Sequence, residues 1–538
     1  MLVGYLLVAV VVLPALCAAV VATIGHRHAE TGGRIAIGGT GVSFLLATAL
    51  AGVVWLDGPV SAVVERSDGR AVVGLTADQV GVLLLLLITG VSVVTQAFAR
   101  RYLRGDPRAR RFFLATGLLT AASSAMVTSA TLIGLAVMWT LAGVALCVLL
   151  GLYSPLPAAR DGVRRTARAF LIGDTALWTA VILATVRWGT LDLRQLSAPT
   201  EAALTDPATL LVVSCLLVVA ALARSAQLPL QRWLPATLAA PTPVSALLHA
   251  GVVNAGGVLL VRTSPIFGAS PAATHLAFVA GAATAVYGTA VMLTKPDVKG
   301  ALAHSTMGQM GFMIMTCGLG WYAAAVFHLV AHGMYKATLF LGSGSAVHEQ
   351  VRDRTAPPVP DRGGRAIGLA AAIAAAAPAA ALVGSAMVLH PAAGGSPDAQ
   401  LLLTFAWASG AWATWGWLRR HPGPRGIGVA IGAALLLAPL YVGLVAGITS
   451  FLAPALTGAG HAAVSPWLLV VVLAAMLGLT VIRFGAAHPR LRELHRTVYV
   501  LALSAGRVGG RSARPHPAAA VTARLLPIRL LPGLRGTR

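Results

Sequence analysis

The sequence is poor in charge, and above all in acidic residues. Only 17 of its 538 residues are Asp or Glu, charged residues make up 11% of the chain, and 57% of it is hydrophobic. Repeated apolar runs approach the ~20 residues that span a bilayer, and the mean hydropathy is +0.80. A set of soluble domains is therefore excluded. The composition predicts an all-α polytopic membrane protein.

The sequence also lacks the patterns that bind metals and nucleotides. Its four cysteines lie singly inside apolar segments, so no zinc or disulfide spacing exists. No Walker, Rossmann or metal motif occurs, and no carboxylate pair stands out for acid–base catalysis. We therefore expect this chain to bind no metal and no cofactor. A primary ATP-driven pump is not expected from this chain alone.

The apolar runs predict about 15 transmembrane helices, at least one of them broken by prolines. The first run lacks a basic leader region and a clear cleavage site, which favours a retained span over a signal peptide. The predicted spans are 2–24, 35–56, 80–99, 112–130, 131–151, 169–187, 209–235 (broken), 241–262, 274–294, 300–318, 321–346, 366–390, 400–418, 428–448 and 466–484. The transmembrane domain is thus expected to cover 1–484, followed by a basic tail at 485–538.

Arginine is distributed unevenly among the predicted loops. If the N-terminus lies outside the cell, the arginine-rich loops 100–111 and 152–168 and the tail all face the cytoplasm. We therefore expect a multi-pass protein of the inner (plasma) membrane with its C-terminus inside. The net charge of +23 is explained by these loops, so we expect no nucleic-acid partner. The tail could lie on anionic lipid, dock a partner or overhang without fixed structure.

Residues 224–262 combine prolines with polar side chains in an apolar setting. Four prolines interrupt this stretch, and a proline inside a helix removes a backbone donor and clashes with the preceding turn. In lipid such a break is tolerated only where protein or a water-lined cavity satisfies the freed backbone groups. Broken helices beside buried ionisable groups are typical of transporter ion sites near the midplane of the bilayer.

Lysine is the scarcest of the charged residues. Only Lys295, Lys299 and Lys336 occur, and a desolvated lysine can release its proton whereas arginine stays charged. His328, His332 and Lys336 are spaced by four residues, so they line one face of a helix at ~6 Å per step. This face could relay protons, or the histidines could merely bond neighbouring helices. The cost of placing three ionisable groups in one span favours the relay.

Five further groups complete the candidate proton or cation path. Lys299 lies just before a span. Two interpretations of it are equally supported: its side chain extends to the lipid headgroups, or it takes part in the channel. His304 extends the polar path one turn later, and His249 lies in the span after the prolines. Arg224 sits at the predicted break, where its permanent charge suits an electrostatic gate or a counter-ion. Asp174 is the only acid clearly inside the early spans.

Over about residues 75–350 the sequence resembles the proton-conducting antiporter-like subunits of respiratory complex I and its relatives. This resemblance implies an architecture built from inverted repeats. The matching segments are 75–78 (LTAD), 101–106 (RYLRGD), Trp139, 173–174 (GD), 225–229 (SAQLP), 233–235 (WLP), 241–247 (PTPVSAL) with His249, 297–299 (DVK), 305–312 (STMGQMGF) and 328–345.

Departures from that pattern indicate one branch of the superfamily. Thr140 follows Trp139 where complex I and sodium/proton antiporter subunits have a glutamate, and Arg224 replaces the family lysine. A lysine or glutamate expected near 366–390 has no counterpart. The sequence looks most like the membrane subunit of the DAB-type inorganic carbon transporters. The residues in question are 249–257 (HAGVVNAGG), Arg262, 264–265 (SP), 310–313 (MGFM), 317–320 (CGLG) and 331–337 (AHGMYKA).

The second resemblance implies a division of labour between two subunits. In the DAB family the membrane subunit pairs with a large cytoplasmic zinc-binding subunit similar to a β-carbonic anhydrase, and proton or sodium flow drives conversion of CO2 to bicarbonate. We therefore expect a transporter subunit and not an enzyme, with that zinc-binding subunit, membrane lipid, and protons or sodium ions as partners. The alternatives are a proton-pumping subunit of NADH–quinone oxidoreductase or of a membrane hydrogenase, and a sodium/proton antiporter subunit.

Overall fold

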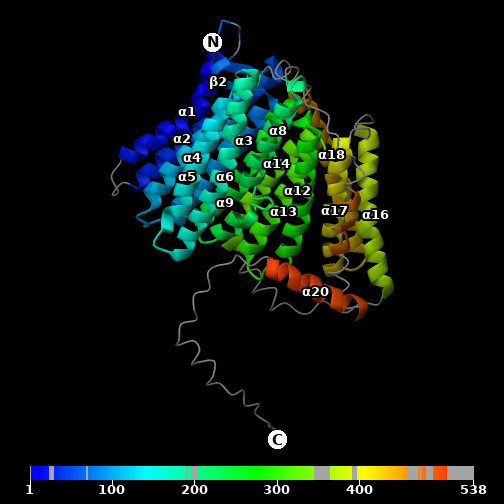
Figure 1. The fold of residues 1–538 in the computed structure, drawn as a ribbon. Helices are drawn as coiled ribbons and strands as arrows, with labels where there is room; N and C mark the ends of the chain where they lie inside the picture. Colours follow the sequence, from blue (N-terminus) through cyan, green and yellow to red (C-terminus); the bar gives the residue numbers. More distant parts are fainter. Residues whose placement is uncertain are drawn as a thin grey trace, which may run out of the picture.

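Helices of membrane length, roughly parallel to one another, make up most of the computed structural model (Figure 1). The structure describes residues 2–23, 29–67, 69, 71–189, 192–194, 203–344, 364–389, 397–456, 470–472, 474–475, 477–479 and 489–505.

The elements follow the apolar runs of the sequence. In chain order they are α1 (Leu2–Thr23), α2 (Ala29–Asp57), β1 (Val60–Glu65), β2 (Ala71–Ala77), α3 (Gln79–Tyr102), α4 (Ala109–Thr128), α5 (Leu132–Leu150), η2 (Gly151–Tyr153), α6 (Pro157–Trp188), α8 (Pro207–Arg224), η3 (Gln231–Thr237), α9 (Thr242–Ala250), η4 (Val252–Asn254), α10 (Ala255–Arg262), α11 (Ser264–Gly268), α12 (Pro271–Met292), α13 (Val298–Gly318), α14 (Tyr322–Leu341), α16 (Gly364–Leu389), α17 (Pro397–Arg420), α18 (Pro424–Leu456) and α20 (Pro489–Ala505).

The expected helical membrane fold is confirmed, whereas the expected number of spans is not. Within the described residues, 12 helical segments are long and apolar enough to cross a membrane, with α9, η4 and α10 counted as one. Two more of the predicted spans, α13 and α17, form helices of 21 and 24 residues that are not among these 12. The last predicted span, 466–484, lies mostly outside the described residues.

One predicted loop is helical. Residues 152–168 were expected to connect two spans, but α6 already begins at Pro157, a residue whose fixed φ suits the first turn of a helix. The four arginines of this segment therefore lie on the first turns of a 32-residue helix. The helix is longer than a bilayer requires, so its arginine-rich start extends past the apolar part.

A β-hairpin interrupts the helical pattern between α2 and α3 and was not expected from the sequence. Its strands β1 and β2 pair antiparallel, with Val60 opposite Ala77. A short bridge joins Leu75 of β2 to Ser129 at the end of α4. The hairpin lies at the end of the bundle near the N-terminus (Figure 1). It therefore covers the ends of α3 and α4.

The predicted helix break is present, and nearby groups satisfy the backbone that it frees. Helix α8 ends at Arg224, and the Trp233 indole N–H donates to the carbonyl of Ala223 over 3.0 Å. The Ser225 hydroxyl donates to the Val253 carbonyl over 2.7 Å, which ties this break to the next one. Such contacts replace the water that is missing at membrane depth.

A second interruption, between α9 and α10, was not predicted. It begins at Gly251, and a single turn of 3-10 helix, η4, precedes α10. No proline lies inside 244–262, so the signal that predicted the first break is missing here. The Asn254 side-chain amide donates to the carbonyl of Ala250 over 2.8 Å, which satisfies one freed backbone group.

Close approach between α12 and α13 fixes the position of α13 in the bundle. A Cβ atom on Gly281 would lie 2.5 Å from the backbone nitrogen of Met315, and one on Gly311 would lie 2.5 Å from that of Ala285. The two backbones therefore touch because these positions have no side chain. Small residues at helix contacts are typical of membrane proteins, where close packing drives association.

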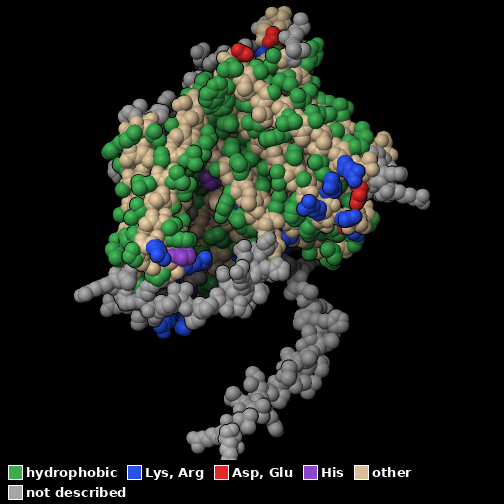
Figure 2. Space-filling view, turned by 180° about the vertical axis from the view of Figure 1, so that it is seen from behind, with side chains coloured by type: hydrophobic (Ala, Val, Ile, Leu, Met, Phe, Trp, Pro, Cys, Tyr) green, Lys and Arg blue, Asp and Glu red, His purple; other side chains and the backbone are tan. Residues whose placement is uncertain are grey.

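Helices α16, α17 and α18 form a separate group beside α14 (Figure 1). An apolar cleft of about 740 Å³ lies between α14 and this group, lined by Phe327 and Tyr441 among others. Figure 2 shows the hollowed face, over which hydrophobic side chains are spread throughout. Most of the visible basic side chains lie in its lower half. That is the end at which α20 lies in Figure 1.

Helix α20 is the described part of the predicted basic tail. It runs across the end of the bundle, nearly perpendicular to the long helices (Figure 1). The Tyr287 hydroxyl on α12 donates to the carbonyl of Ala505 over 2.9 Å. Residues 506–538 of the tail lie outside the described residues, so the predicted domain boundary stays a prediction.

Asp192 anchors the hairpin from a distant part of the chain. Its carboxylate accepts from the Ala71 amide over 2.8 Å and from the Arg194 guanidinium over 2.7 Å, while Arg194 also pairs with Glu65. Burial opposes ionisation of Asp192, but the hydrogen bonds from Arg194 and from the Ala71 amide outweigh it and hold the pKa of that carboxyl below its ordinary value.

Replacement of Asp192 by Asn should therefore loosen the hairpin. A hydrogen bond to a charged group contributes about 1.5–3 kcal/mol, so we expect amides of β2 to exchange with solvent roughly 10-fold faster or more in Asp192→Asn. Because the folded pKa is depressed, the stabilisation is present above about pH 3.9 and is lost as pH falls through the folded value. Hydrogen exchange measured against pH tests both statements.

The control for this experiment is Asp161→Asn, which removes a partly buried ion pair with Arg165 within α6. Helical pairs four residues apart contribute about 0.3–0.5 kcal/mol, and this pair does not involve the hairpin, so β2 exchange should stay at the wild-type rate. Equal exchange rates in the two variants would contradict the anchoring role of Asp192.

Candidate functional site

Helix α14 places three ionisable side chains on a face that points into the bundle. His328, His332 and Lys336 follow one another at intervals of four residues, as predicted. His332 is 3% exposed and Lys336 is fully buried, while His328 is half-buried. The opposite face, with Met334 and others, is exposed. These groups therefore do not face lipid.

The Lys336 amine is held by neutral acceptors from α13. Its Nζ atom donates to the Ser305 hydroxyl over 2.8 Å and lies 3.5 Å from the carbonyl of Leu302. In the described part of the chain no carboxylate forms an ion pair with it. A buried amine without a carboxylate partner is costly, which is why such groups in membranes are usually functional.

The histidines around Lys336 have unused hydrogen-bonding capacity. Both ring nitrogens of His332, Nδ1 of His249 and Nε2 of His328 have no partner among the described residues. The rings of His328 and His332 stack with their centroids 5.8 Å apart, and His249 stacks on Phe340 at 4.3 Å. Buried polar atoms are nearly always paired with protein or water, so these nitrogens are suited to bind water.

Glycine at position 333 explains how the two helices bring these groups together. A Cβ on Gly333 would lie 2.8 Å from the carbonyl of Ala250, at the end of α9. Because glycine has no side chain, α14 packs directly on α9 at this position. His249 is the next-to-last residue of α9. His249 thereby stacks on Phe340, which follows Lys336 by one turn on the same face of α14.

The start of α13 adds two of the predicted residues to this cluster. His304 is 2% exposed and its Nδ1 lies 2.9 Å from the carbonyl of Gly300, within its own helix. It immediately precedes Ser305, which binds Lys336. Lys299 is half-buried and its amine donates to the carbonyl of Ala240 over 3.4 Å. The polar row thus continues from Lys336 toward the beginning of α13.

Arg224 and Asp174 form a second, separate centre. The Arg224 guanidinium donates to the Asp174 carboxylate over 2.8 Å, and the Trp139 indole donates to the same oxygen over 2.8 Å. The guanidinium carbon lies 4.4 Å from the Trp139 ring and 4.0 Å from that of Phe170. Thr140, at the position of the family glutamate, accepts from the Trp178 indole instead.

This second centre is built for a planar, permanent cation. Arg224 is 1% exposed and a Cβ on Gly143 would approach its Nη1 atom to 2.9 Å, so α5 leaves room for the guanidinium. Guanidinium groups stack on aromatic rings and stay charged, whereas an ammonium is a compact point charge. The centre therefore fixes a positive charge at the end of α8.

The structure divides the eight predicted residues into two groups. Lys336, His332, His328 and His249 converge, and Lys299 and His304 lie at the start of the neighbouring α13. Arg224 and Asp174 pair with each other, and within the described residues no hydrogen bond or ion pair links them to that cluster. The contacts made by Ser305, Phe340 and Phe170 were not predicted from the sequence. These contacts form between different helices, and the spacing of residues along one helix does not predict them.

These features define a class of protein. A bundle of membrane-length helices with interrupted helices and ionisable groups at membrane depth is an ion-transport type of membrane subunit. The chain belongs to the family described as NADH:quinone oxidoreductase/Mrp antiporter, TM, whose model matches residues 129–406. A model for the N-terminus of NADH-ubiquinone oxidoreductase (complex I) chain 5 matches residues 66–113.

Relatives of this chain include inorganic carbon transporter subunits and quinone oxidoreductase subunits. It is 40% identical over 279 residues to the probable inorganic carbon transporter subunit DabB1 of Halothiobacillus neapolitanus, covering 51% of this chain and 50% of that one. It is 36% identical to the probable subunit DabB of Bacillus subtilis, covering 52% and 55%. It is 37% identical to NADH-quinone oxidoreductase subunit L of Mycobacterium tuberculosis, covering 51% and 44%. The chain spans about half the length of the curated relatives it matches.

Solved structures share the fold over nearly the whole chain. The Mrp complex from Dietzia sp. matches with a TM-score of 0.63 and 26% identity, covering 96% of this chain and 59% of that one. A chain of an archaeal membrane-bound sulfane sulfur reductase matches with a TM-score of 0.55 and 18% identity, covering 93% and 97%, which shows the fold alone. The expected antiporter-like family is therefore confirmed.

The geometry at Arg224 predicts a ranking of two variants. Arg224→Ala leaves the Asp174 carboxylate without its cation, and breaking a buried pair costs about 3–5 kcal/mol. Arg224→Lys keeps the charge but loses the two stacked rings, at about 1–2 kcal/mol. Thermal unfolding of the purified protein should therefore rank wild type above Arg224→Lys, and Arg224→Lys above Arg224→Ala.

Arg187→Ala is the matched control, because it removes a half-exposed arginine paired with Asp206. Its effect should stay below about 1 kcal/mol. If Arg224→Lys were as stable as wild type, charge alone would matter at this position and the ring contacts would not.

Proposed function

We propose that this chain is the membrane subunit of an energy-coupled inorganic carbon transporter and conducts protons or sodium ions through the cluster around Lys336. The observation that supports conduction is the fully buried Lys336 amine, which is held by Ser305 and has no carboxylate partner within the described residues. Unpaired imidazole nitrogens next to it provide binding positions for water or a proton. Lipid-facing placement of these groups would have removed this support.

The inorganic carbon branch is supported by two features of the chain. Two of its relatives are named as probable inorganic carbon transporter subunits, from two different bacteria. Position 140 carries a hydroxyl where a carboxylate would be expected in a complex I or antiporter subunit, and position 224 carries an arginine. In this proposal the Arg224–Asp174 pair is a fixed counter-charge, and Lys336 is the group that exchanges protons.

The proposed partner is a large cytoplasmic subunit that binds zinc and interconverts CO2 and bicarbonate. The absence of a group of three or more potential metal ligands in the described residues is compatible with that division. The basic side chains near α20 would face the cytoplasm, with the N-terminus outside, as the distribution of arginine favours.

The second candidate is a proton-pumping subunit of a quinone oxidoreductase, supported by the 37% identity to subunit L of that enzyme. Purification of the native complex, followed by zinc and iron analysis, separates the two. We expect a stoichiometric zinc protein without iron–sulfur subunits. Copurification of iron–sulfur subunits would overturn the carbon-transport proposal and leave the conduction proposal intact.

Conduction is tested by replacing the buried lysine. Lys336→Ala removes the only lysine in the interior of the described helices, so carbon accumulation and growth in ambient air should fall to the level of the deletion strain. The complex should still assemble, because one side chain is lost from a packed helix.

Thr338→Ala is the matched control, since Thr338 lies two residues further along α14 on its exposed face. Growth and carbon uptake of this variant should equal those of wild type. Unchanged transport in an assembled Lys336→Ala complex would show that the assignment of Lys336 is wrong.

A further inference from the structure

Helices α2, α3 and α4 carry a chain of neutral polar side chains that the cluster around Lys336 does not use. The Gln96 amide donates to the Thr40 hydroxyl over 3.0 Å and to the Ser92 hydroxyl over 2.9 Å. Ser92 in turn lies 2.6 Å from the hydroxyl of Thr120. All four side chains are at most 3% exposed, so three helices are joined by buried polar contacts at membrane depth.

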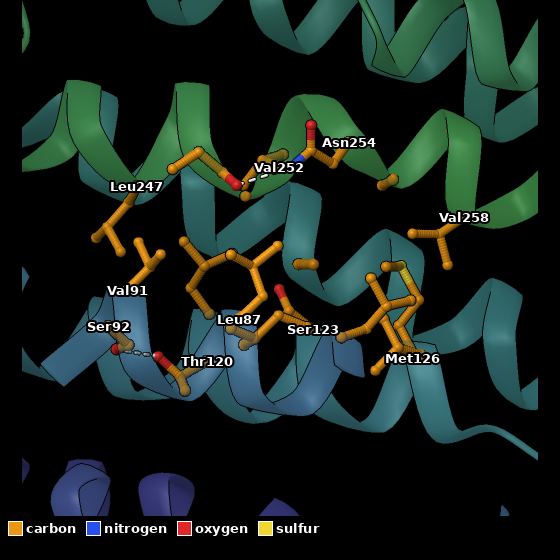
Figure 3. A pocket seen from close by; sticks show the side chains of 18 of the residues that line it. Leu87, Val91, Ser92, Thr120, Ser123, Met126, Leu247, Val252, Asn254 and Val258 are labelled. Atoms are coloured by element: carbon orange, nitrogen blue, oxygen red, sulfur yellow. Dashed lines mark hydrogen bonds between the residues drawn. The ribbon is translucent and has the colours of Figure 1, made fainter. Parts of the chain in front are cut away.

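This polar chain ends at a cavity in the centre of the bundle. The cavity has a volume of about 50 Å³ and lies between α3, α4 and the broken segment that contains α9 and α10. Ser92 and Thr120 lie on one wall, where Figure 3 shows their hydrogen bond, and Asn254 lies on the opposite wall. Arg224 also lines the cavity. The cavity therefore lies between the neutral polar chain and the fixed charge of the second centre.

The volume and the polar groups suit a short file of water. A single water needs about 10–15 Å³ measured in this way and two to four polar partners, so the space holds several molecules. Ser123 directs its hydroxyl into the space between the two walls (Figure 3). Ser123 and Arg224 line this space, and the side-chain oxygen of Asn254 has no partner among the described residues. Most of the remaining lining is aliphatic.

Unpaired buried atoms around the polar chain provide independent support. Five polar atoms on α2, α3 and α4 have no hydrogen-bond partner among the described residues, and their side chains are fully buried. A buried polar atom left unpaired costs about 1–3 kcal/mol, so such a concentration calls for bound water. These atoms are the hydroxyls of Ser43, Thr95, Thr116 and Ser124 and the Oε1 of Gln96.

We propose that α2, α3 and α4 form a second hydrated passage, which leads from the level of Gln96 to the central cavity beside Arg224 and Asn254. Gln96 lies six residues before the end of α3, about 9 Å from the arginine-rich terminus of that helix. The passage contains no titratable side chain among the described residues before Arg224. Its ligand is water, and a proton would move along it only between water molecules and hydroxyls.

Hydroxyl-radical footprinting of the full chain in lipid nanodiscs tests for this water. Radicals formed from bound water oxidise nearby methionines to the sulfoxide. Met126 lines the cavity although it is only 5% exposed, whereas Met315 is 1% exposed and packs in an apolar cluster. We expect Met126 to be oxidised at least 5-fold faster than Met315. Equal slow oxidation of both would overturn the proposal.

Variants determine whether water enters along the polar chain. The double variant Ser92→Ala/Thr120→Val keeps the shape of the wall but removes two hydroxyls, so Met126 oxidation should fall at least 3-fold. Thr128→Val is the matched control, because its hydroxyl bonds only within α4 and does not line the cavity. Unchanged oxidation of Met126 in the double variant would overturn the assignment of the passage to these helices.

Proton flux in proteoliposomes tests whether the passage takes part in transport, and this test rests on the proposed function. A failure of the passage can be distinguished from a failure of the proposed function. We expect proton flux to fall at least 3-fold in the double variant and to stay at the wild-type rate in Thr128→Val. Wild-type flux with reduced Met126 oxidation would show that the passage is hydrated but not conducting. That outcome would overturn its role in transport while leaving conduction through Lys336 in place.

Discussion

The hydrogen bond between the Lys336 amine and the Ser305 hydroxyl is the contact around which the candidate site is organised. It places an ionisable nitrogen at full burial with a neutral acceptor, in surroundings that penalise charge. Glycines allow the backbones of α12 and α13 to touch, which holds Ser305 in place. Gly333, which also has no side chain, lets α14 pack against α9. Glycine packing and the buried amine are thus parts of one arrangement.

The bundle separates two kinds of positive charge. Arg224 is fixed by a carboxylate and two aromatic rings, which makes it a permanent element of the local field. Lys336 has no such partner within the described residues and is surrounded by imidazoles with free nitrogens. A relay needs a group that changes its protonation, whereas a fixed cation contributes a constant term to the field inside the bundle. The chain therefore assigns the two roles to different residue types.

Much of this arrangement was predictable from the sequence, where the signal is local. The four-residue spacing placed His328, His332 and Lys336 on one face, and the prolines marked the end of α8. The break at Gly251 was not predictable, because it contains no proline and depends on Asn254 satisfying a freed carbonyl. The hairpin was also missed, since its two short strands lie between apolar helices and are anchored by Asp192 from far along the chain. The pairing of Arg224 with Asp174 depends on the packing of α6 against α8, which no single helix encodes.

Exchange of the Lys336 amine protons with bulk water is the most direct measure of the central claim. The chain contains only three lysines, so ¹⁵N labelling of lysine gives three side-chain signals, and Lys336→Arg identifies the buried one. If Lys336 conducts protons, its amine exchanges its protons with solvent within seconds although its side chain is fully buried. Persistence of its protons over hours in deuterated buffer would contradict a conducting role for Lys336.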